Sequence, residues 1–384
     1  MALRRVGYRK TTVGFWSLIL SALFHSARPW TYTIVVDAGS TGSRAYIYHN
    51  DVDNGKISEY PGSRVKPGLS TFVGHGTNVT QYFWPLFESA ANLIPDDHHS
   101  TTRCYIMATA GMRLLDKHDQ DGIFDALYFG LADSAFPFQL QRDSFEVIEG
   151  SSEAYYAALA TNFLGGPLRK GESKKPLLGA LDLGGSSTQI TVPHQHPSPE
   201  QGGSTYLDGE LPDQEMFWMR SYLSMGVNTA RVQFFDHLVA TTDSRKETDE
   251  GNNALFLANP CGFRGHRQTH DYHGEKRVLV GTGDAAACSE GLVKALRLSH
   301  NGRPAFTDGM PAVDGIGFYA MSVFYYALDA ARHYSAHSSP SPARGGDGGP
   351  WHAWPTPSVR EIRAGAAEFC ALPWQQEGEA VGAA

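Results

Sequence analysis

The sequence predicts two α/β lobes that share one architecture and each present a glycine-rich loop. Two observations support this prediction. The chain has 384 residues, which is enough for two or three domains with cores of their own. A motif of Asp, any residue and Gly, followed by small and hydroxyl residues, occurs as DAGSTGSR at 37–44 and again as DLGGSSTQ at 182–189. Because both copies lie between short apolar segments, a domain length apart, we expect a duplicated fold whose two loops face a shared cleft.

The composition excludes two classes of protein. Lys and Arg number 32 against 40 Asp and Glu, a net charge of −8, whereas nucleic-acid-binding proteins normally show a basic surface. The four Cys are too few for a small scaffold held by disulfides. We therefore expect no nucleic-acid partner.

The first 30 residues have the features of a targeting segment. Four Lys and Arg side chains within 4–10 precede an apolar stretch at 13–24, as in a secretory signal. This stretch of 12 residues is shorter than the roughly 20 that span a bilayer as a helix. His25 makes a poor cleavage site, so an uncleaved anchor is the alternative. We expect residues 1–30 to be a signal peptide or short signal anchor, with membrane contact only if the segment stays uncleaved.

A secretory location makes two modifications feasible. Asn78 begins an N-x-[ST] sequon just before a helix-like run at 81–94, so it is a candidate glycosylation site, although many sequons stay unmodified. Oxidation of cysteines to disulfides also becomes feasible.

Apolar periodicity and turn residues predict the elements in order along the chain. Helices are expected at 151–164 and at 316–331, the second rich in aromatic residues. The Ser, Pro and Gly content of 335–357 indicates a linker or a disordered insert. The predicted strands are 33–36, 45–48, 105–108, 177–183 and 190–192.

The residue types of the two loops suit phosphate binding. Glycine lets backbone N–H groups approach an anion closely, and Ser and Thr hydroxyls add donors. Asp37 and Asp182 would repel phosphate, but each can hold a hydrated divalent cation that offsets the phosphate charge. One such turn is ordinary hairpin chemistry, whereas two indicate a phosphate site. The candidate phosphate-binding loop residues are Gly39, Ser40, Thr41, Gly42, Ser43, Gly184, Gly185 and Ser186.

Two polar residues between the loops are further candidates. Thr109, in ATAGMR at 108–113, follows a predicted strand, where its hydroxyl either faces the cleft or only ends the strand. Glu153 falls in the first turn of a predicted helix, whose dipole stabilises a carboxylate by about 0.3–1 kcal/mol. An ordinary N-terminal helix carboxylate is the alternative. Together with the two loops, Thr109 is expected to bind phosphate and Glu153 to act in catalysis.

With these motifs the chain resembles the apyrase and nucleoside diphosphatase family, which includes the ecto-apyrases and the Golgi GDPases. The resemblance runs from about residue 33 to about residue 375 and keeps the family's order of motifs. Its five main regions are 37–44, 108–113, 150–164, 181–190 and 318–326. Three further segments, SYL with GVNTAR at 221–231, NPC at 259–261 and GTGD at 281–284, also resemble the family.

The resemblance implies an actin-like (RNase H-like) duplicated two-lobe fold with a nucleotide cleft between the lobes. It implies hydrolysis of the terminal phosphate of nucleoside di- or triphosphates with Ca²⁺ or Mg²⁺. From the N-terminal signal we expect the protein in the ER or Golgi lumen or outside the cell. Matched position by position, Glu153 would be the general base, and Ser187 and Gln189 would hold the attacking water. Asp37 and Asp182 would hold the waters of the metal ion.

The same resemblance implies roles for residues further along the chain. Cys261 and Cys288 would form a disulfide, and Tyr325 or Tyr326 would stack on the nucleotide base. Cys370 resembles a paired family cysteine whose partner would lie beyond this sequence. Cys104, in an apolar strand, is expected to be a buried thiol.

The sequence departs from the family in two respects. Ala154 and Ala158 stand where the family has Gly and Trp, which bears on helix packing. The sequence stops at Ala384 where family members continue, so we expect a truncated C-terminal end. We expect the first lobe at 31–150 and the second at 151–384.

Two alternatives to a hydrolase are open at this point. A sugar or acetate kinase of the same superfold has similar loops, and a catalytically impaired nucleotide-binding relic would fit the short C-terminus. Release of free phosphate without an acceptor distinguishes a hydrolase from both. The preferred base, the choice between the two metals and the oligomeric state do not follow from the sequence.

Overall fold

The described part of the chain forms two compact units. The N-terminal unit holds the described residues up to Val227 together with Phe318–Val323, and the C-terminal unit holds those of Asn228–Gly317 and those after Val323. The expected targeting segment at 1–30 lies outside the described residues. Within the described residues, no helix combines the length and apolar character needed to cross a membrane. The computed structural model describes residues 31–51, 56–74, 76–166, 168, 175–194, 211–241, 256–300, 303–304, 307–337, 351, 353 and 355–374.

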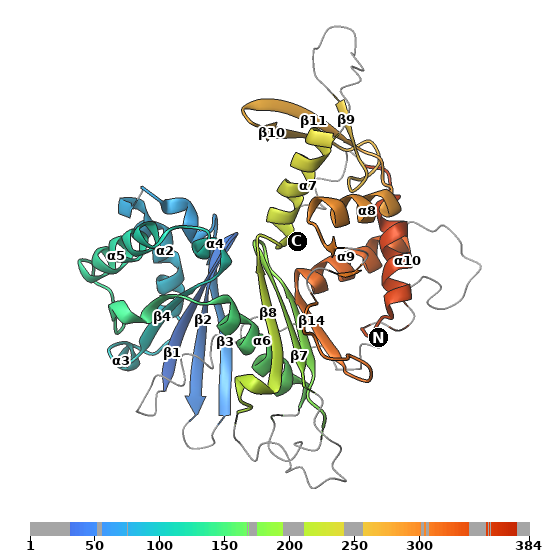
Figure 1. Ribbon diagram of the computed structural model, residues 1–384. Coiled ribbons are helices and arrows are strands. Elements are labelled where there is room, and N and C mark those ends of the chain that lie inside the picture. Colours follow the sequence, from blue (N-terminus) through green and yellow to red (C-terminus); the bar gives the residue numbers. More distant parts are fainter. Residues whose placement is uncertain are drawn as a thin grey trace. The chain divides into compact units, whose positions relative to one another are not determined.

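The N-terminal unit contains a five-stranded sheet in the order β3-β2-β1-β4-β5 (Figure 1). β1 is antiparallel to β2 and parallel to β4, and β3 is antiparallel to β2. The first glycine-rich loop is therefore the turn between β1 and β2. The strands are β1 (Tyr32–Gly39), β2 (Gly42–Asp51), β3 (Lys56–Val65), β4 (Arg103–Ala108) and β5 (Phe145–Val147).

A four-stranded sheet in the same unit repeats this arrangement. β6 is antiparallel to β7 and parallel to β14, and β8 is antiparallel to β7. The order β3-β2-β1-β4 of the first sheet thus recurs as β8-β7-β6-β14, which confirms the predicted duplication. The strands are β6 (Gly179–Leu183), β7 (Ser187–Pro193), β8 (Phe217–Leu223) and β14 (Phe318–Ser322).

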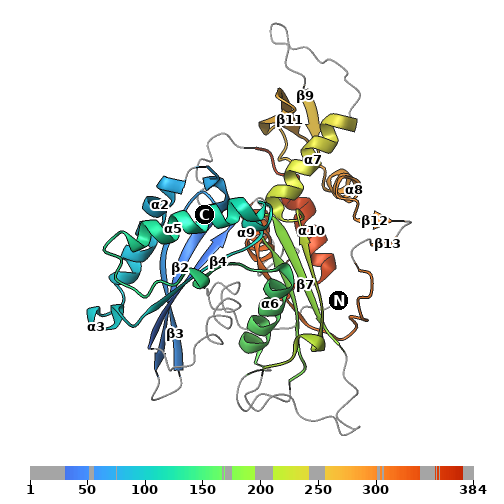
Figure 2. The same cartoon turned by 60° about the vertical axis from the view of Figure 1, so that its left-hand side comes forward.

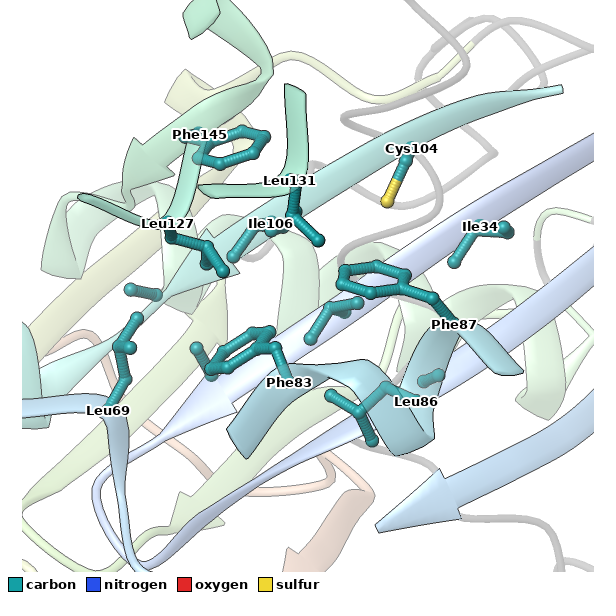
Figure 3. Close-up of a cluster of buried hydrophobic side chains, with 14 of the residues drawn as sticks. Ile34, Leu69, Phe83, Leu86, Phe87, Cys104, Ile106, Leu127, Leu131 and Phe145 are labelled. Atoms are coloured by element: carbon teal, nitrogen blue, oxygen red, sulfur yellow. The ribbon is translucent and has the colours of Figure 1, made fainter. Parts of the chain in front are cut away.

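Helices cover both faces of the first sheet. On one face, α2 (Gly76–Ala91) and α5 (Lys117–Ala132) enclose a core that includes Phe83, Phe87 and Leu127 (Figure 3). This core also contains the buried free thiol of Cys104, as predicted. Smaller elements of this unit are the helices α3 (Asp96–His99) and α4 (Ala110–Arg113) and the 3-10 turns Leu69–Phe72, Arg142–Ser144 and Gln214–Met216.

The other face of the first sheet packs against α6 (Gly150–Gly165). Tyr156 of α6 joins a cluster that contains Val35 and Met107. The same helix contacts β6, β7 and β8 of the second sheet. Ala154 and Ala158 are completely buried, so α6 presents small side chains where it packs closely. Glu153 lies in the first turn of this helix, which packs against both sheets.

The C-terminal unit is built on a three-stranded sheet in the order β10-β11-β9. Figure 2 shows two of its strands, β9 and β11, near α7. Phe234, Phe235, Leu257 and Leu279 form its buried core. Cys261 and Cys288 form a disulfide that joins the turn after β9 to α8. Its elements are α7 (Val227–Thr241), β9 (Phe256–Asn259), β10 (Arg267–Tyr272), β11 (Glu275–Gly281), α8 (Ala285–Ala295), β12 (Ser299–His300), β13 (Arg303–Pro304), α9 (Val323–His337) and α10 (Val359–Cys370).

The structure confirms the strands predicted around both loops and the helix at 151–164, but two predictions need correction. The helix expected at 316–331 was wrong over its first part, since Phe318–Ser322 is strand β14 and only Val323 begins α9. A short apolar aromatic run is compatible with either state, and pairing with β6 selects the strand. The insert expected at 335–357 is ordered at its ends, because α9 reaches His337 and Trp351 is buried. Its central residues, 338–350, lie outside the described part.

Candidate active site

The two glycine-rich loops place equivalent residues in equivalent registers. Asp37 lies opposite Arg44 on the β1–β2 hairpin, and Asp182 lies opposite Gln189 on the β6–β7 hairpin. Arg44 Nη1 and Asp37 Oδ2 are 3.5 Å apart. On the next strand of each sheet, Arg64 lies opposite Arg44 and Ser221 lies opposite Gln189. Each sheet thus has a row of three residues in register, which is Asp37, Arg44 and Arg64 in the first sheet and Asp182, Gln189 and Ser221 in the second. In the first row the Asp is followed by two cationic side chains, and in the second row it is followed by two neutral polar side chains.

Glu153 lies at the centre of a compact hydrogen-bond network. Its Oε2 accepts hydrogen bonds from Arg113 Nη2 at 2.6 Å and from Gln189 Nε2 at 2.8 Å. Ser187 Oγ accepts from the same two nitrogens, at 3.1 Å and 2.8 Å. Ser221 Oγ accepts from Gln189 Nε2 at 3.0 Å. The structure thus brings together the three side chains predicted to be catalytic, Glu153, Ser187 and Gln189, and adds Arg113 and Ser221.

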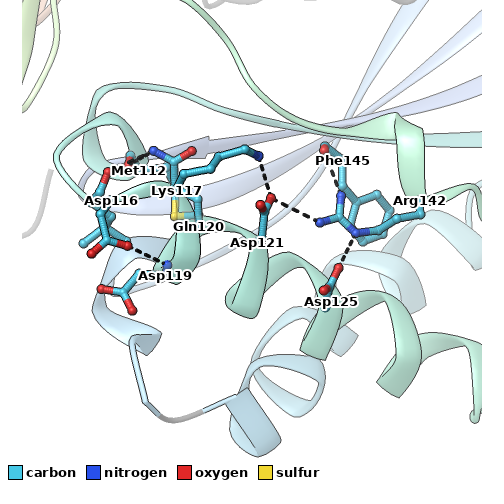
Figure 4. Close-up of polar contacts among 10 residues, drawn as sticks. Met112, Asp116, Lys117, Asp119, Gln120, Asp121, Asp125, Arg142 and Phe145 are labelled. Carbon is cyan, nitrogen blue, oxygen red and sulfur yellow. Dashed lines mark hydrogen bonds and ion pairs between the residues drawn. The ribbon is translucent and has the colours of Figure 1, made fainter.

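Arg113 joins segments that are distant in the sequence. Its Nη1 donates to the carbonyl of Ile148 at 3.0 Å, while its Nη2 contacts Glu153 and Ser187. The turn that carries Arg113 is fixed by Gln120 of α5, whose Nε2 donates to the carbonyls of Met112 and Leu115 (Figure 4). Arg113 belongs to α4, which follows strand β4 of the first sheet, and Ser187 belongs to β7 of the second sheet. The Arg113 side chain therefore links these two parts of the unit.

Arg113 and Ser221 were not among the predicted site residues, although both stand in segments that resemble the family. The signal for Arg113 was a lone cation four residues after Thr109, at the end of the ATAGMR motif. No comparable signal marked Ser221, whose proximity to Gln189 arises only from the pairing of β7 with β8.

The carboxylates of the site share an electrostatic environment that disfavours negative charge. Burial raises the pKa of Glu153 to about 7; the charge of Arg113 opposes this, and those of Asp182 and Asp37 add to it. Burial raises the pKa of Asp37 to about 6, against the nearby charges of Arg44 and Arg64. Burial also raises the pKa of Asp182, against a hydrogen bond from Ser322. In all three cases burial is the main cause, and the nearby Arg side chains offset it only in part for Glu153 and Asp37.

The residues present fit a hydrated divalent cation. Asp37 and Asp182 are close enough for the charge of Asp182 to raise the pKa of Asp37. Asp182 Oδ1 is buried and has no hydrogen-bond partner among the described residues. No three His, Cys, Asp or Glu side chains cluster as a direct metal site within the described ranges. Two carboxylates with an unsatisfied oxygen suit an ion that is held through its waters.

The phosphate-binding candidates occupy the turns of both hairpins. Gly39, Ser40, Gly184 and Gly185 are half-buried and Thr41 is exposed. Gly42, Ser43 and Ser186 are buried, so any contact they make with a ligand would come mainly from the backbone. Thr109 precedes α4, and its backbone N–H donates to the carbonyl of Ala38 at 3.3 Å, beside the first loop.

Glycines from other segments pack directly against both loops, and the sequence analysis missed them. A Cβ at Gly68 would lie 2.3 Å from Ser40 O, and one at Gly111 would lie 2.8 Å from Ser40 Cα. A Cβ at Gly226 would lie 2.3 Å from Ser186 N. Real side chains cannot approach backbone atoms so closely. Each loop is therefore held in place by backbone that only glycine can supply.

A pocket of about 340 Å³ opens beside the network. Arg113, Gly150, Ser151 and Ser221 are among its lining residues. The pocket therefore reaches two members of the Glu153 network, from the side of β8 and the first turn of α6.

The remaining predicted residues belong to other elements, and each is described where it stands. Tyr325 and Tyr326 are neighbours on α9, with ring centroids 5.4 Å apart and Tyr326 exposed. Asn78 is exposed in the first turn of α2. Cys370 is a half-buried free thiol in α10.

Comparison with known proteins places the chain in a family. Residues 25–338 match the model of the GDA1/CD39 (nucleoside phosphatase) family. This match covers most of the chain. The chain belongs to this family, which confirms the resemblance found in the sequence.

Relatives within the nucleoside phosphatase family include two proteins of Schizosaccharomyces pombe. A guanosine-diphosphatase is 28% identical over 67% of this chain and 47% of its own length. A Golgi apyrase is 30% identical over 78% of this chain and 55% of its own length. The chain thus spans about half the length of these curated relatives.

A solved structure supports the fold assignment. A nucleoside triphosphate hydrolase from Neospora caninum aligns with a TM-score of 0.61 at 16% identity, over 94% of this chain and 83% of that one. The fold is therefore the two-lobed, actin-like α/β fold that the sequence predicts.

Proposed function

We propose that this protein hydrolyses nucleoside di- or triphosphates and releases the terminal phosphate. The observation that supports this most strongly is the network of Glu153, Ser187 and Gln189 in the same compact unit as the paired Asp37 and Asp182. Membership of the nucleoside phosphatase family and the guanosine-diphosphatase and apyrase relatives agree with this activity. They do not favour the kinase or the inactive relic.

In the proposed reaction, Glu153 is the general base. A water held by Ser187 and Gln189 attacks the terminal phosphorus while Glu153 takes one of its protons. The new P–O bond forms as the phosphoanhydride bond breaks, and the shortened nucleotide leaves with the bridging oxygen. Glu153 suits this role because, within the described residues, its side-chain hydrogen bonds end on Oε2, which leaves Oε1 to accept the proton.

Positive charge at the site comes from the protein and from a divalent cation, Ca²⁺ or Mg²⁺. Asp37 and Asp182 would hold the cation through its waters, as their buried carboxylates and the unsatisfied Asp182 Oδ1 allow. When bound, it offsets negative charge on the phosphate oxygens. Neither loop contains a Lys that could do so instead.

The loop residues and Thr109 would bind the phosphates. Gly39, Ser40 and Thr41 from the first loop and Gly184 and Gly185 from the second lie at half-buried or exposed turns, where glycine backbone and hydroxyls can approach an anion. The N–H of Gly184 itself donates to the carbonyl of Ser187 at 2.9 Å, so Gly184 would contribute close approach and no donor. Gly42, Ser43, Thr109 and Ser186 would complete the set. We assign base stacking to Tyr325 or Tyr326, neighbouring aromatic side chains on α9.

We place the protein in the secretory pathway or outside the cell. The Cys261–Cys288 disulfide suits an oxidising compartment, and Golgi apyrase is among the relatives. The exposed Asn78 is then available for glycosylation, and residues 1–30 would serve as signal peptide or anchor.

A phosphate-release assay tests this function. The purified chain is offered di- and triphosphates of guanosine, uridine and adenosine with Mg²⁺, Ca²⁺ or EDTA. We expect free phosphate with either cation and none in EDTA. Phosphate transfer that occurs only when a sugar or acetate is added would identify a kinase, and nucleotide binding without release would identify a relic.

A further inference from the structure

We propose that Ser221 is a positioning residue that fixes the side-chain amide of Gln189 for the reaction. The inference rests on the hydrolase function proposed above and extends it to a residue of the third strand of the second sheet. Ser221 of β8 lies directly opposite Gln189 of β7, and its Oγ accepts a 3.0 Å hydrogen bond from Gln189 Nε2.

The amide of Gln189 is held from two sides. Its Nε2 lies 2.8 Å from Oε2 of Glu153, the proposed general base, and 2.8 Å from Oγ of Ser187, which is proposed to hold the water. Ser221 holds the same nitrogen from β8. Without this third contact, the amide nitrogen would keep its hydrogen bonds to Ser187 and to Glu153, and Glu153 gains a proton in the proposed reaction.

Hydrogen-bond counting separates positioning from stability. The amide nitrogen of Gln189 carries two hydrogens and has three oxygen acceptors within reach. If Ser221 Oγ is removed, both N–H groups still have an acceptor, and no buried donor is left unpaired. The Ser221 hydroxyl therefore constrains where the amide sits and contributes little to folding.

Gly150 provides the space that Ser221 occupies. A Cβ at Gly150 would lie 2.6 Å from Ser221 Oγ and 2.7 Å from Ser221 Cβ. Any larger residue there would push β8 away from the first turn of α6, which also carries Glu153. Because Gly150 has no side chain, Ser221 of β8 can approach the first turn of α6. There it joins Glu153 and Gln189 in one hydrogen-bond network.

The first sheet shows that this row is specialised. Its equivalent positions are Asp37, Arg44 and Arg64, whereas the second sheet has Asp182, Gln189 and Ser221. The two residues that follow Asp37 in its row are cationic. The two that follow Asp182 in the other row are neutral, and one of them, Gln189, contacts Glu153. Neutral hydrogen-bonding side chains are suited to holding an uncharged water molecule.

The first test compares Ser221→Ala with the parent chain in the phosphate-release assay. We expect kcat to fall about 10- to 100-fold, as for a small misplacement of a catalytic group, with KM and the thermal unfolding midpoint unchanged. The matched control is Ser151→Ala, which removes an exposed hydroxyl from the same pocket and should leave kcat unchanged. An unchanged kcat in Ser221→Ala would overturn the proposal.

A double-mutant cycle tests whether Ser221 acts through Gln189. Adding Ser221→Ala to Gln189→Ala should cause no further loss of kcat, because the amide that Ser221 positions is gone. Gly150→Ala should lower kcat in the same way as Ser221→Ala. If the losses in the Gln189→Ala background are as large as in the parent, Ser221 acts by another route and the proposal is wrong.

A direct measurement covers the case in which the parent releases no phosphate. The side-chain amide signals of Gln189, assigned by comparison with Gln189→Ala, are recorded by NMR in ¹⁵N-labelled chain. In Ser221→Ala these signals should shift and broaden, whereas in Ser151→Ala they should stay in place. Unchanged signals in Ser221→Ala would overturn the positioning role, whereas an inactive parent would overturn only the proposed function.

Discussion

At the scale of single residues, the ionisation of Glu153 sets the pH range of the proposed reaction. A general base works only when deprotonated. Burial raises the pKa of Glu153 to about 7, and the charge of Arg113 lowers it. Activity should therefore fall as the pH drops below 7.

We predict that the acidic limb of kcat/KM has its midpoint near pH 7 in the parent and at higher pH in Arg113→Gln. The substitution removes the cation that favours the carboxylate form of Glu153. The measurement is a pH series of initial phosphate-release rates for both chains. A limb that moves to lower pH in Arg113→Gln would contradict this electrostatic account.

The two serines of the second loop should differ in importance. Ser187 Oγ accepts hydrogen bonds from Arg113 and Gln189, whereas we assign Ser186 only to phosphate binding. We predict a loss of kcat of about 100-fold for Ser187→Ala and a much smaller loss for Ser186→Ala. Steady-state kinetics of the two variants, both of which remove a buried hydroxyl, check this order. Equal losses would remove the special role of Ser187.

The sequence predicted the site residues that belong to a local motif. Asp37 and Asp182 follow from the two repeated loops, where glycines and hydroxyls mark the turn, and the roles of Ser187 and Gln189 follow from the family resemblance of the second loop. Arg113 and Ser221 could not be assigned, because the structure joins them to Glu153 and Gln189 across 40 and 32 positions of sequence. Such contacts depend on the packing of α6 and the pairing of β8, which no short pattern encodes.

At the scale of elements, the segment before α7 supports the second loop. The N–H groups of Ser224 and Val227 donate to the carbonyls of Ser186 and Gly184 at 2.8 Å and 3.0 Å. Thr188 Oγ1 donates to the carbonyl of Met225 at 2.8 Å. Gly226 makes this approach possible, since a Cβ there would lie 2.5 Å from Ser187 N.

We predict that Gly226→Ala reduces kcat at least as much as Ser187→Ala, about 100-fold, because the second loop must shift. The matched control is Gly122→Ala, an exposed glycine of α5 whose Cβ would meet nothing within 4 Å. That change should keep full activity and raise the unfolding free energy by about 1 kcal/mol. Full activity in Gly226→Ala would show that the loop tolerates displacement.

Elements were predictable where the local pattern was unambiguous. The strands around both loops follow from short apolar runs that end at Asp and Gly. β14 was missed because its five residues, which continue directly into α9, are as apolar as the helix that follows. Its parallel pairing with β6 decides the matter, and this pairing spans more than a hundred residues of sequence.

At the scale of the whole molecule, a disulfide contributes to the stability of the C-terminal unit. Cys261 and Cys288 are 27 residues apart in sequence. Closing a loop of this size typically stabilises a protein by about 3 kcal/mol.

We predict that replacing Cys261 and Cys288 together with Ser lowers the unfolding free energy of this unit by about 3 kcal/mol. The control is Cys370→Ser, which alters a half-buried free thiol. Calorimetry with and without reductant provides the measurement. The parent should lose stability in reductant and the double variant should not; equal responses would show that the disulfide adds nothing.

The duplicated architecture brings the site together. The repeated strand order gives each sheet a hairpin with an Asp at the same position, and α6 brings Glu153 to Ser187 and Gln189. The sequence predicted the duplication because both loops keep their motif. The sequence could not predict that Arg44 and Arg64 would lie side by side in one sheet and Gln189 and Ser221 in the other. These neighbours appear only once β3 pairs with β2 and β8 pairs with β7.

The most direct test of the account is phosphate release by the parent and by Glu153→Gln, with saturating nucleotide and Mg²⁺ or Ca²⁺. The amide keeps the shape of the side chain but cannot take a proton from water. We predict that kcat falls by about 10² to 10⁴ while nucleotide affinity, measured by calorimetry on the same chains, stays nearly the same. Turnover of Glu153→Gln within a few-fold of the parent would contradict the assignment of Glu153 as the general base.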